Sequence, residues 1–501
     1  MRKVTLGAAA SSILAMLLAA LFFSSGGVKE GFAPLELLSA LPSAEANAPL
    51  ILIAALKGEF PQYASRLFAD SAAVSPGGAS PVTALLPVFD SSGAVALVMT
   101  ERPGGFAMYG AFTLSEEERE ALGSFRLPPG WKGCFVRPDM HGVDDDGLFQ
   151  IRANNMASPL YLEVRADRAY IADSLPDIER IREVRLGRAE GLRKDWAIGK
   201  EWRGRMFLSD GGVLGSMILG SGGESAGAKA TEIEVAWTSS VSSAGSSGQP
   251  SGEAEWRISG AENVIGRTLL HDLRDKDWSS DDIFIPDPLI MALGVNLPHP
   301  PRDLSSMPAS MRYLADQLRK MGLGNADIKA LLTGPATISL GGRTQLLWFE
   351  LPGITLDIPG RGDAAFRLID KFWTELFLGA DPKPIEGYTH GGVTDLPFTV
   401  LAAGNEEKAV IGLSASDVEQ NAELKDLLRQ VGNAVAWFYV DIPKLGVSLT
   451  ELPAINSILY EYEEGPVDEE SAGMLRDVMS HLGRLFVTWE SPESGRAVWY
   501  Y

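Results

Sequence analysis

The fold is decided by the stretch Ala169-Tyr170-Ile171-Ala172-Asp173-Ser174, which returns 240 positions later as Ala409-Val410-Ile411-Gly412-Leu413-Ser414. In both copies the serine is followed three positions later by an aspartate, Asp177 or Asp417. A short apolar run predicts a strand, and a serine with an acid three positions on is typical of a helix start. The sequence therefore predicts one strand-to-helix unit written twice.

Further patterns recur in the same order. The region after Pro159 resembles the region after Pro397, and the offset is 238; the other three pairs are Val235–Ser239 with Val487–Ser491, Ser251–Trp256 with Ser494–Trp499, and Val74–Gly78 with Ile338–Gly342. Drift in the offset is expected because surface loops tolerate changes of length. We expect an internal duplication, with residues 1–28 followed by one unit at 29–260 and a second at 261–501.

Each unit is expected to be α+β. Ala254, Trp256 and Ile258 alternate with charged residues, which predicts a strand of a sheet with one solvated face. Helical spacing predicts a helix over about 308–321 and another after Asp363, and the matching tryptophan segments predict a closing hairpin in each unit. The fold class is therefore two homologous units, each a mainly antiparallel sheet with helices packed on it, after an N-terminal signal or anchor helix.

The N-terminal segment indicates export. Arg2 and Lys3 precede the uncharged run Val4–Val28, which is typical of a signal peptide and also long enough to anchor the chain in a bilayer. Both readings stay open. Cys134 is the only cysteine, so neither a lipid-bearing cysteine near the N-terminus nor an internal disulfide is expected. The periplasmic side of a bacterial cytoplasmic membrane, anchored or secreted, fits best.

The charge balance excludes one class of partner. The formal net charge is −21, and the densest charged segment, Glu461–Glu470, is acidic. Nucleic-acid binding needs clustered Lys and Arg, so no nucleic-acid partner is expected. Acids at the first turn of a helix complement its dipole, which favours a solvated capping role for this segment.

Candidate catalytic chemistry is sparse. His141 with Asp144–Asp146 is the only compact set of metal-ligand types, and its three consecutive acids are more typical of a turn than of a calcium loop. Cys134 lies in an apolar stretch and predicts a buried thiol. Gly360-x-Gly362-x-x-Ala365 predicts a capped turn before a helix. We therefore predict no catalytic residue, no metal and no cofactor.

The tryptophans are the candidate ligand-binding residues. Trp237, Trp256, Trp489 and Trp499 lie in the matching hairpins. Core packing explains them most simply, and the alternative is an apolar groove for a lipid-like or peptide ligand.

The chain also resembles a group of uncharacterised, membrane-tethered bacterial exported proteins with a duplicated α+β domain of unknown function. The resemblance rests on the leader, Leu41–Ala44, Leu331–Gly334 and the strand-like segment Ala436–Pro443. It implies no reaction and no site residue.

Three functions follow as hypotheses. The first is a non-enzymatic scaffold or interaction module of the cell envelope, with an envelope protein as partner. The second is a carrier or sensor of an apolar ligand. The third is a metal-assisted hydrolase that uses His141.

Overall fold

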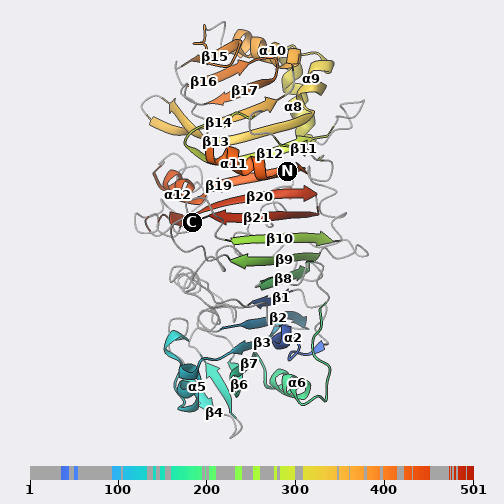
Figure 1. Cartoon of the computed structure of the whole chain (residues 1–501), viewed down its shortest axis with the longest axis vertical. Helices are drawn as coiled ribbons and strands as arrows, with labels where there is room; N and C mark the ends of the chain where they lie inside the picture. The colour runs from blue at the N-terminus through green and yellow to red at the C-terminus, as the bar shows by residue number, and fades with distance from the viewer. Residues whose placement is uncertain are drawn as a thin grey trace. The chain divides into compact units, whose positions relative to one another are not determined.

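The fold was analysed in a computed structural model of the 501-residue chain. The structure describes residues 35–43, 50–54, 93–102, 105–131, 139–142, 147–152, 159–194, 198, 202, 204–209, 232–239, 252–259, 273, 276–278, 283–298, 309–346, 349–359, 362–376, 381–394, 399–413, 422–431, 433–451, 473, 476, 479–480, 483–491 and 493–500. The chain divides into two compact units, Met1–Thr268 (unit 1) and Leu269–Tyr501 (unit 2). Both are built mostly of antiparallel sheet with few helices, as Figure 1 shows.

Unit 1 contains one continuous antiparallel ladder. Its strands follow one another in space as β4 (Asp139–Gly142), β5 (Leu148–Arg152), β6 (Leu160–Arg165), β7 (Arg168–Ala172), β3 (Gly105–Thr113), β2 (Val95–Arg102), β1 (Leu50–Ala54), β8 (Gly204–Ser209), β9 (Glu232–Ser239) and β10 (Gly252–Ser259). The short helices are α2 (Leu35–Leu38), α5 (Glu116–Gly123), the 3-10 turn η2 (Pro129–Trp131) and α6 (Leu175–Arg185).

The core of unit 1 lies between the sheet and helices α2 and α6. Alternate residues of β1, β2, β3 and β7 pack there against Leu37, Leu41, Ile178 and Ile181. On α5, Ser115 and Glu118 cap the helix reciprocally, and the Glu118 side chain also accepts a hydrogen bond of 3.0 Å from Trp131 Nε1. A local capping motif is thereby tied to the core.

Unit 2 contains a second ladder. Its spatial order is β15 (His390–Thr394), β16 (Val400–Gly404), β17 (Lys408–Leu413), β14 (Phe349–Pro359), β13 (Gly334–Leu346), β12 (Leu289–Leu297), β19 (Ala436–Asp441), β20 (Arg484–Ser491) and β21 (Ser494–Tyr500). A separate two-stranded pair joins β11 (Lys276–Asp277) to β18 (Asn433–Ala434).

The helices of unit 2 cover parts of both sheet faces. They are α8 (Ala309–Lys320), α9 (Asn325–Leu331), α10 (Gly362–Lys371), its π-helical continuation η8 (Phe372–Leu376), α11 (Ala422–Val431) and α12 (Ile442–Glu451). Helices α8, α9 and α10 form one core cluster with Val400, Ala402 and Ala409. Figure 1 shows these three helices grouped beside β15, β16 and β17. Leu424, Leu427 and Leu428 of α11 belong to a second cluster with Trp437 and Tyr439.

Several predicted elements are confirmed. Helix α8 occupies the segment predicted over 308–321, and Gly322 ends it with a φ of +81°. The predicted helix after Asp363 is α10, with Ala365, Leu368 and Ile369 buried. Strand β10 alternates as predicted, since Ala254 and Trp256 are buried and Glu255 is exposed. The closing hairpins β9–β10 and β20–β21 are both present.

Two details of the strands go beyond the sequence patterns. The Gly341-Gly342 pair lies inside β13, at an irregularity in the pairing with β14, where Gly342 has a φ of +62°. The strand expected over 436–443 ends at Asp441. There Asp441 Oδ1 accepts the Lys444 amide at 3.0 Å and Pro443 occupies the first turn of α12, where its missing N–H costs nothing. The helix predicted to begin at Ser414 falls partly outside the described residues, and α11 is described from Ala422.

Candidate functional site

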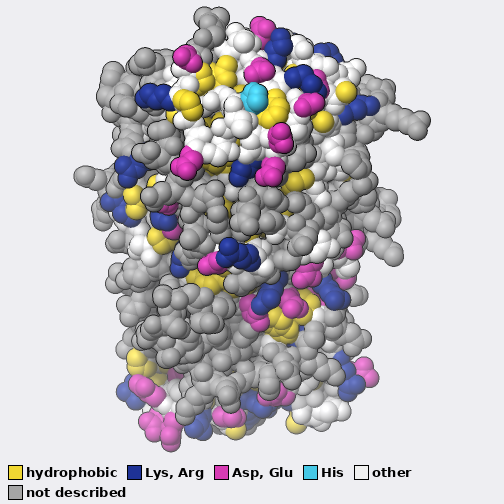
Figure 2. All heavy atoms as spheres, turned by 45° about the horizontal axis from the view of Figure 1, so that its top comes forward, with side chains coloured by type: hydrophobic (Ala, Val, Ile, Leu, Met, Phe, Trp, Pro, Cys, Tyr) yellow, Lys and Arg dark blue, Asp and Glu magenta, His cyan; other side chains and the backbone are white. Residues whose placement is uncertain are grey.

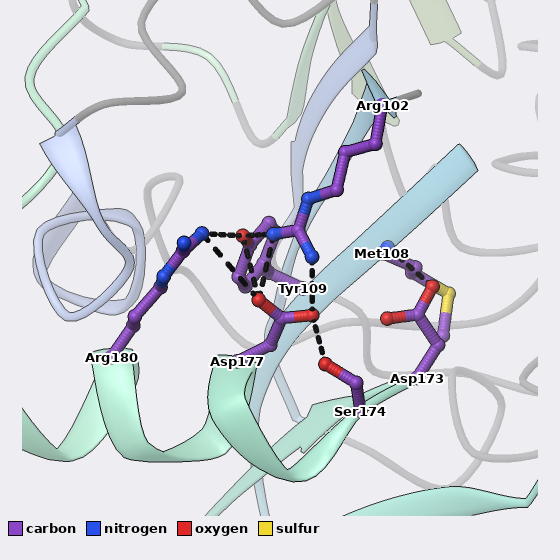
Figure 3. A network of polar contacts seen from close by, with 7 residues as sticks. All are labelled: Arg102, Met108, Tyr109, Asp173, Ser174, Asp177 and Arg180. Carbon is purple, nitrogen blue, oxygen red and sulfur yellow. Dashed lines mark hydrogen bonds and ion pairs between the residues drawn. The ribbon is translucent and has the colours of Figure 1, made fainter. Parts of the chain in front are cut away.

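Among the described residues of unit 1, the carboxylate of Asp177, in the first turn of α6, lies at the centre of a polar network (Figure 3). Arg102 of β2 donates to it through both terminal nitrogens, at 2.8 Å from Nη1 to Oδ2 and 2.6 Å from Nη2 to Oδ1. The Tyr109 hydroxyl of β3 donates at 3.1 Å, and the Ser174 hydroxyl donates to Oδ2. The Asp177 side chain is fully buried, whereas the Arg102 side chain is 31% exposed.

The same network ties three elements together. Arg102 also donates to the Tyr109 hydroxyl, and its guanidinium lies 5.4 Å from the centre of the Tyr109 ring. From α6, Arg180 Nη1 donates to the same hydroxyl at 3.3 Å. A bidentate arginine–carboxylate pair fixes geometry as well as charge, so this network clamps α6 to β2 and β3.

Electrostatics separates Asp177 from its neighbour Asp173. Burial alone would raise the pKa of Asp177, but hydrogen bonds from Arg102, Ser174 and Tyr109, with the charge of Arg102, lower it below its ordinary value. Burial, and next the charge of Asp177, raise the pKa of Asp173 to about 6, even though Met108 N donates to it at 3.2 Å. Asp173 can therefore exchange a proton near neutral pH while Asp177 stays ionised.

A carboxyl pair with divergent pKa values is the arrangement that general acid catalysis uses. Here, however, both oxygens of Asp177 are occupied by donors of the chain itself. The geometry fits a structural clamp with one titratable neighbour better than it fits a reaction centre.

A second buried carboxylate lies on β6. Glu163 receives hydrogen bonds from Arg165 at 3.0 Å, Arg182 at 3.2 Å and Arg185 at 2.6 Å, and its side chain is fully buried. The Arg185 guanidinium also lies 4.5 Å from the centre of the Tyr170 ring. Two of the three arginines come from α6, so Glu163 holds the C-terminal half of the helix that Asp177 holds at its start.

Sequence reasoning found part of this arrangement. Helix α6 begins where Ser174-x-x-Asp177 predicts, but the Ser174 hydroxyl contacts the Asp177 carboxylate and makes no side-chain hydrogen bond to a helix amide. Arg102 and Tyr109 were missed. They lie 75 and 68 positions before Asp177, and no local pattern links residues so far apart.

The four candidate ligand-binding tryptophans are buried. Trp237 and Trp256, in β9 and β10, are 2% and 3% exposed, and Trp489 and Trp499, in β20 and β21, are 6% and 3% exposed. The Trp237 ring fills the space above Gly204, where a Cβ would lie 2.0 Å from it. Burial agrees with the core-packing interpretation. Ligand binding at these side chains stays a prediction.

Other predicted features lie outside the described residues: residues 1–28, Cys134, Asp144–Asp146 and Glu461–Glu470. His141 lies on β4, and its side chain is likewise outside them. Within the described part of the chain, no three His, Cys, Asp or Glu side chains gather as metal ligands. None of the helices described there is long and apolar enough to cross a bilayer.

The described surface carries both signs of charge. Figure 2 shows Lys and Arg mixed with Asp and Glu on the face it presents, with hydrophobic side chains between them. That face offers no large block of one charge on the described residues.

Comparison with known proteins gives little. No family model matches the chain, and no curated protein matches it. Crystal forms III, I and IV of TP0453 give TM-scores of 0.26, 0.27 and 0.25 at 9%, 9% and 10% sequence identity. The matches cover 44%, 44% and 46% of this chain and 78%, 76% and 84% of those chains. The structural similarity to TP0453 is weak, and no residue role is carried over from it.

Proposed function

We propose that units 1 and 2 arose by duplication of one antiparallel fold. The first support is strand order. From β5 to β10, unit 1 runs β5-β6-β7-β3-β2-β1-β8-β9-β10, and unit 2 runs β15-β16-β17-β14-β13-β12-β19-β20-β21. The nine strands thus follow the same order in both units. Along the chain, α6 lies between β7 and β8, and α11 lies between the equivalent strands β17 and β19.

The second support is register. In unit 1, the residue beside Trp237 is Ala236. Successive directly paired residues on neighbouring strands connect Ala236 to Tyr170, in the order Arg205, Ile53, Ala96 and Ala111. In unit 2, the residue beside Trp489 is Thr488. Paired residues connect Thr488 to Val410 in the same way, in the order Trp437, Gly294, Thr337 and Asp357. Tyr170 and Val410 are the residues that the opening sequence match aligns. Two sequence matches with different offsets are thus joined by hydrogen-bond register across four intervening strands.

The strand register makes some residues equivalent that the sequence matches do not align. It pairs Leu162 of β6 with Ala402 of β16, at an offset of 240 instead of 238. It makes Val98 the equivalent of Ser339, so Val74–Gly78 is not the counterpart of β13. Trp499 becomes the equivalent of Ile258, one position of the same face beyond Trp256. Features present in only one of the two units are then the candidates for a functional role, since the shared fold does not require them.

For the molecular function, we propose a non-enzymatic interaction module of the bacterial envelope, exported through residues 1–28 and acting through unit 2. One observation carries this proposal. Leu293, Ile338, Ile354 and Leu413, here called the aliphatic row, are 38%, 53%, 54% and 43% exposed. Leu293 is paired with Ile338 and Ile354 with Leu413, while Leu340, two positions after Ile338, is paired with Ile354. The four side chains therefore share one face of β12, β13, β14 and β17.

The aliphatic row lies on the same sheet face as the core under α8, α9 and α10, next to the part that these helices cover. Val295, Leu356 and Ile411, two positions from row members on the same face, pack against the α8–α10 cluster. Three strand spacings give the row a length of roughly 14 Å. Single exposed aliphatic residues need no explanation, but a row across four adjacent strands is typical of an interaction surface. Covering it would gain roughly 1 kcal/mol per side chain, since each is about half exposed.

The partner proposed for the row is an apolar surface of another envelope protein. Site-specific photocrosslinking in intact cells tests this, with the crosslinking side chain at Ile338 or Ile354. Leu186, which is 55% exposed beside α6 in unit 1, is the matched control. A discrete protein adduct from both row positions and none from Leu186 is expected. Equal labelling from all three positions would contradict the proposal.

The second candidate, a carrier of an apolar ligand, predicts a different adduct in the same experiment. Mass spectrometry of the labelled tryptic peptide would then show a lipid-sized addition in place of a protein. Its support is the wholly aliphatic character of the row. The third candidate, a hydrolase using His141, stays a prediction, because the His141 side chain and Asp144–Asp146 lie outside the described residues.

A further inference from the structure

The inner face of the same strands carries an unexpected polar group. Thr337 and Ser339 of β13 and Thr355 and Asp357 of β14, here called the polar block, are 0%, 1%, 1% and 1% exposed. Thr337 is paired directly with Asp357, and Ser339 with Thr355. Directly paired residues share a face with their Cβ atoms about 5 Å apart, so the four side chains form a two-by-two square.

The block is enclosed by hydrophobic neighbours. Phe284, which is 3% exposed, donates its amide to Asp357 Oδ2 at 3.0 Å. On one side Thr337 is paired with Gly294, above which lies the Trp437 indole, since a Cβ on Gly294 would be 2.2 Å from Trp437 Nε1. On the other side Thr355 is paired with Gly412. Because Gly294 has no side chain, the Trp437 indole can lie over it, next to Thr337.

Four polar atoms here lack a hydrogen-bond partner within the described structure: Thr337 Oγ1, Ser339 Oγ, Thr355 Oγ1 and Trp437 Nε1. A buried polar group without a partner is costly, and folded proteins rarely keep one. Four together in one region call for an occupant that the chain itself does not supply.

The fold does not require this polarity. The register makes Ala96, Val98, Tyr109 and Ala111 of unit 1 the equivalents of Thr337, Ser339, Thr355 and Asp357. All four unit 1 residues are buried core residues. Three of these positions are therefore apolar in unit 1, as Ala96, Val98 and Ala111, where unit 2 carries two hydroxyls and a carboxylate. At the fourth, the Tyr109 hydroxyl has its partners in the Asp177 network.

We propose that the polar block is a binding site for a small cluster of internal water molecules. The partnerless set includes Trp437 Nε1, which can only donate, and three hydroxyls, which can donate and accept. Water satisfies both kinds, whereas a bare cation would leave the indole N–H unsatisfied. An apolar ligand would satisfy neither. Internal water of this kind makes about three hydrogen bonds to buried polar groups.

Isosteric substitution gives the sharp test. Thr337→Val and Thr355→Val keep shape and remove one hydroxyl each. With bound water, each variant should raise the unfolding equilibrium constant roughly three- to tenfold, because one set of hydrogen bonds is lost. Oxygen-17 magnetic relaxation dispersion, with water as the probe, should show fewer long-lived internal waters in both variants than in the unaltered chain.

The matched control is Val98→Thr, which places a hydroxyl at the apolar equivalent of Ser339. It should destabilise unit 1 without adding a long-lived water. Higher stability of both valine variants with an unchanged relaxation signal would overturn the proposal. Native mass spectrometry of the full chain that found a stoichiometric metal or organic ligand, lost in Thr337→Val, would overturn the assignment to water.

Discussion

Arg102 places both terminal guanidinium nitrogens on the carboxylate of Asp177, 2.8 Å and 2.6 Å away, across 75 positions of sequence. The pair joins the end of β2 to the start of α6. The carboxylate is buried and the guanidinium is partly exposed. Asp177 therefore needs Arg102 to balance its charge, whereas water can solvate part of the Arg102 charge.

A double-mutant cycle should reveal that dependence. Arg102→Met leaves a buried carboxylate with fewer donors and should lower the free energy of unfolding by about 2 kcal/mol, a value reduced from fully buried pairs because Arg102 is partly exposed. Asp177→Asn should lower the free energy of unfolding much less in the Arg102→Met variant than in the unaltered chain, which gives a coupling energy of about 1 kcal/mol or more. Urea denaturation of the four proteins measures it. Strictly additive losses would show that the pair is not a unit.

Asp173 should make stability depend on pH. Its pKa is about 6 in the folded chain against an ordinary 3.8, so between these values the folded state binds more protons than the unfolded state. Its contribution is therefore greatest below about pH 4 and is lost as the pH rises through about 6. The full shift corresponds to about 3 kcal/mol, and partial exposure reduces the expected effect to about 1 kcal/mol.

Asp173→Asn checks this dependence. The difference in unfolding free energy between the unaltered chain and the variant should change between pH 4 and pH 6.5 and stay constant above it, with the variant gaining relative stability as the pH rises. Carboxylates that do not interact with Asp173 contribute equally to both proteins and cancel, and Asp177, whose pKa is lowered, stays ionised over this range. A difference that is flat across the whole range would contradict the elevated pKa.

Removing the charge of Glu163 should weaken the C-terminal half of α6. Glu163→Gln leaves Arg165, Arg182 and Arg185 facing one another, so we expect a loss of about 2 kcal/mol that added salt partly restores by screening. Glu183→Gln is the control, since its pair with Arg188 is exposed. Thermal unfolding at low and high salt distinguishes the two. Equal, small effects of both substitutions would contradict a structural role for the Glu163 cluster.

Two glycines should be intolerant of a methyl group. A Cβ at Gly204 or Gly294 would lie 2.0 Å or 2.2 Å from the ring of Trp237 or Trp437, and both rings are buried. Gly204→Ala and Gly294→Ala should each cost about 1–3 kcal/mol through overpacking. Gly123→Ala has nothing within 4 Å and should be neutral or slightly stabilising. Differential scanning calorimetry compares the three, and a neutral Gly294→Ala would show that the indole can move aside.

Periodicity and local chemistry predicted much of the fold. Helices α8 and α10, the start of α6 and the two hairpins followed from apolar spacing, a capping pattern and tryptophan segments. Strand β13 was harder, because its aliphatic Ile338 faces solvent while Thr337 and Ser339 face inward. In a strand with one solvated face, the polar residues usually face water and the apolar residues face the core, and this part of β13 has the opposite arrangement.

The candidate site was less predictable for a physical reason. The Asp177 network, the polar block and the aliphatic row are each assembled from residues of different strands, so they exist only once strand order and register are set. The Ser174-x-x-Asp177 pattern did mark one member, although it was interpreted as a cap. A sequence signal for the others would be an unexpected inversion, such as Thr337-Ile338-Ser339 in the middle of an otherwise apolar ladder.

The inversion in β13 and β14 has a consequence for folding. A slip of one residue in the position of this strand pair would turn Ile338 and Ile354 inward and the polar block outward, which the hydrophobic effect favours locally. The native alignment must be held by other features. One is the irregularity between Gly341 and Thr344, and another is the close approach of Gly341 to the backbone of Pro288 and Leu289. An inserted or deleted residue near Gly341 would release that restraint, and we expect the slipped, aggregation-prone pairing to compete with the native one.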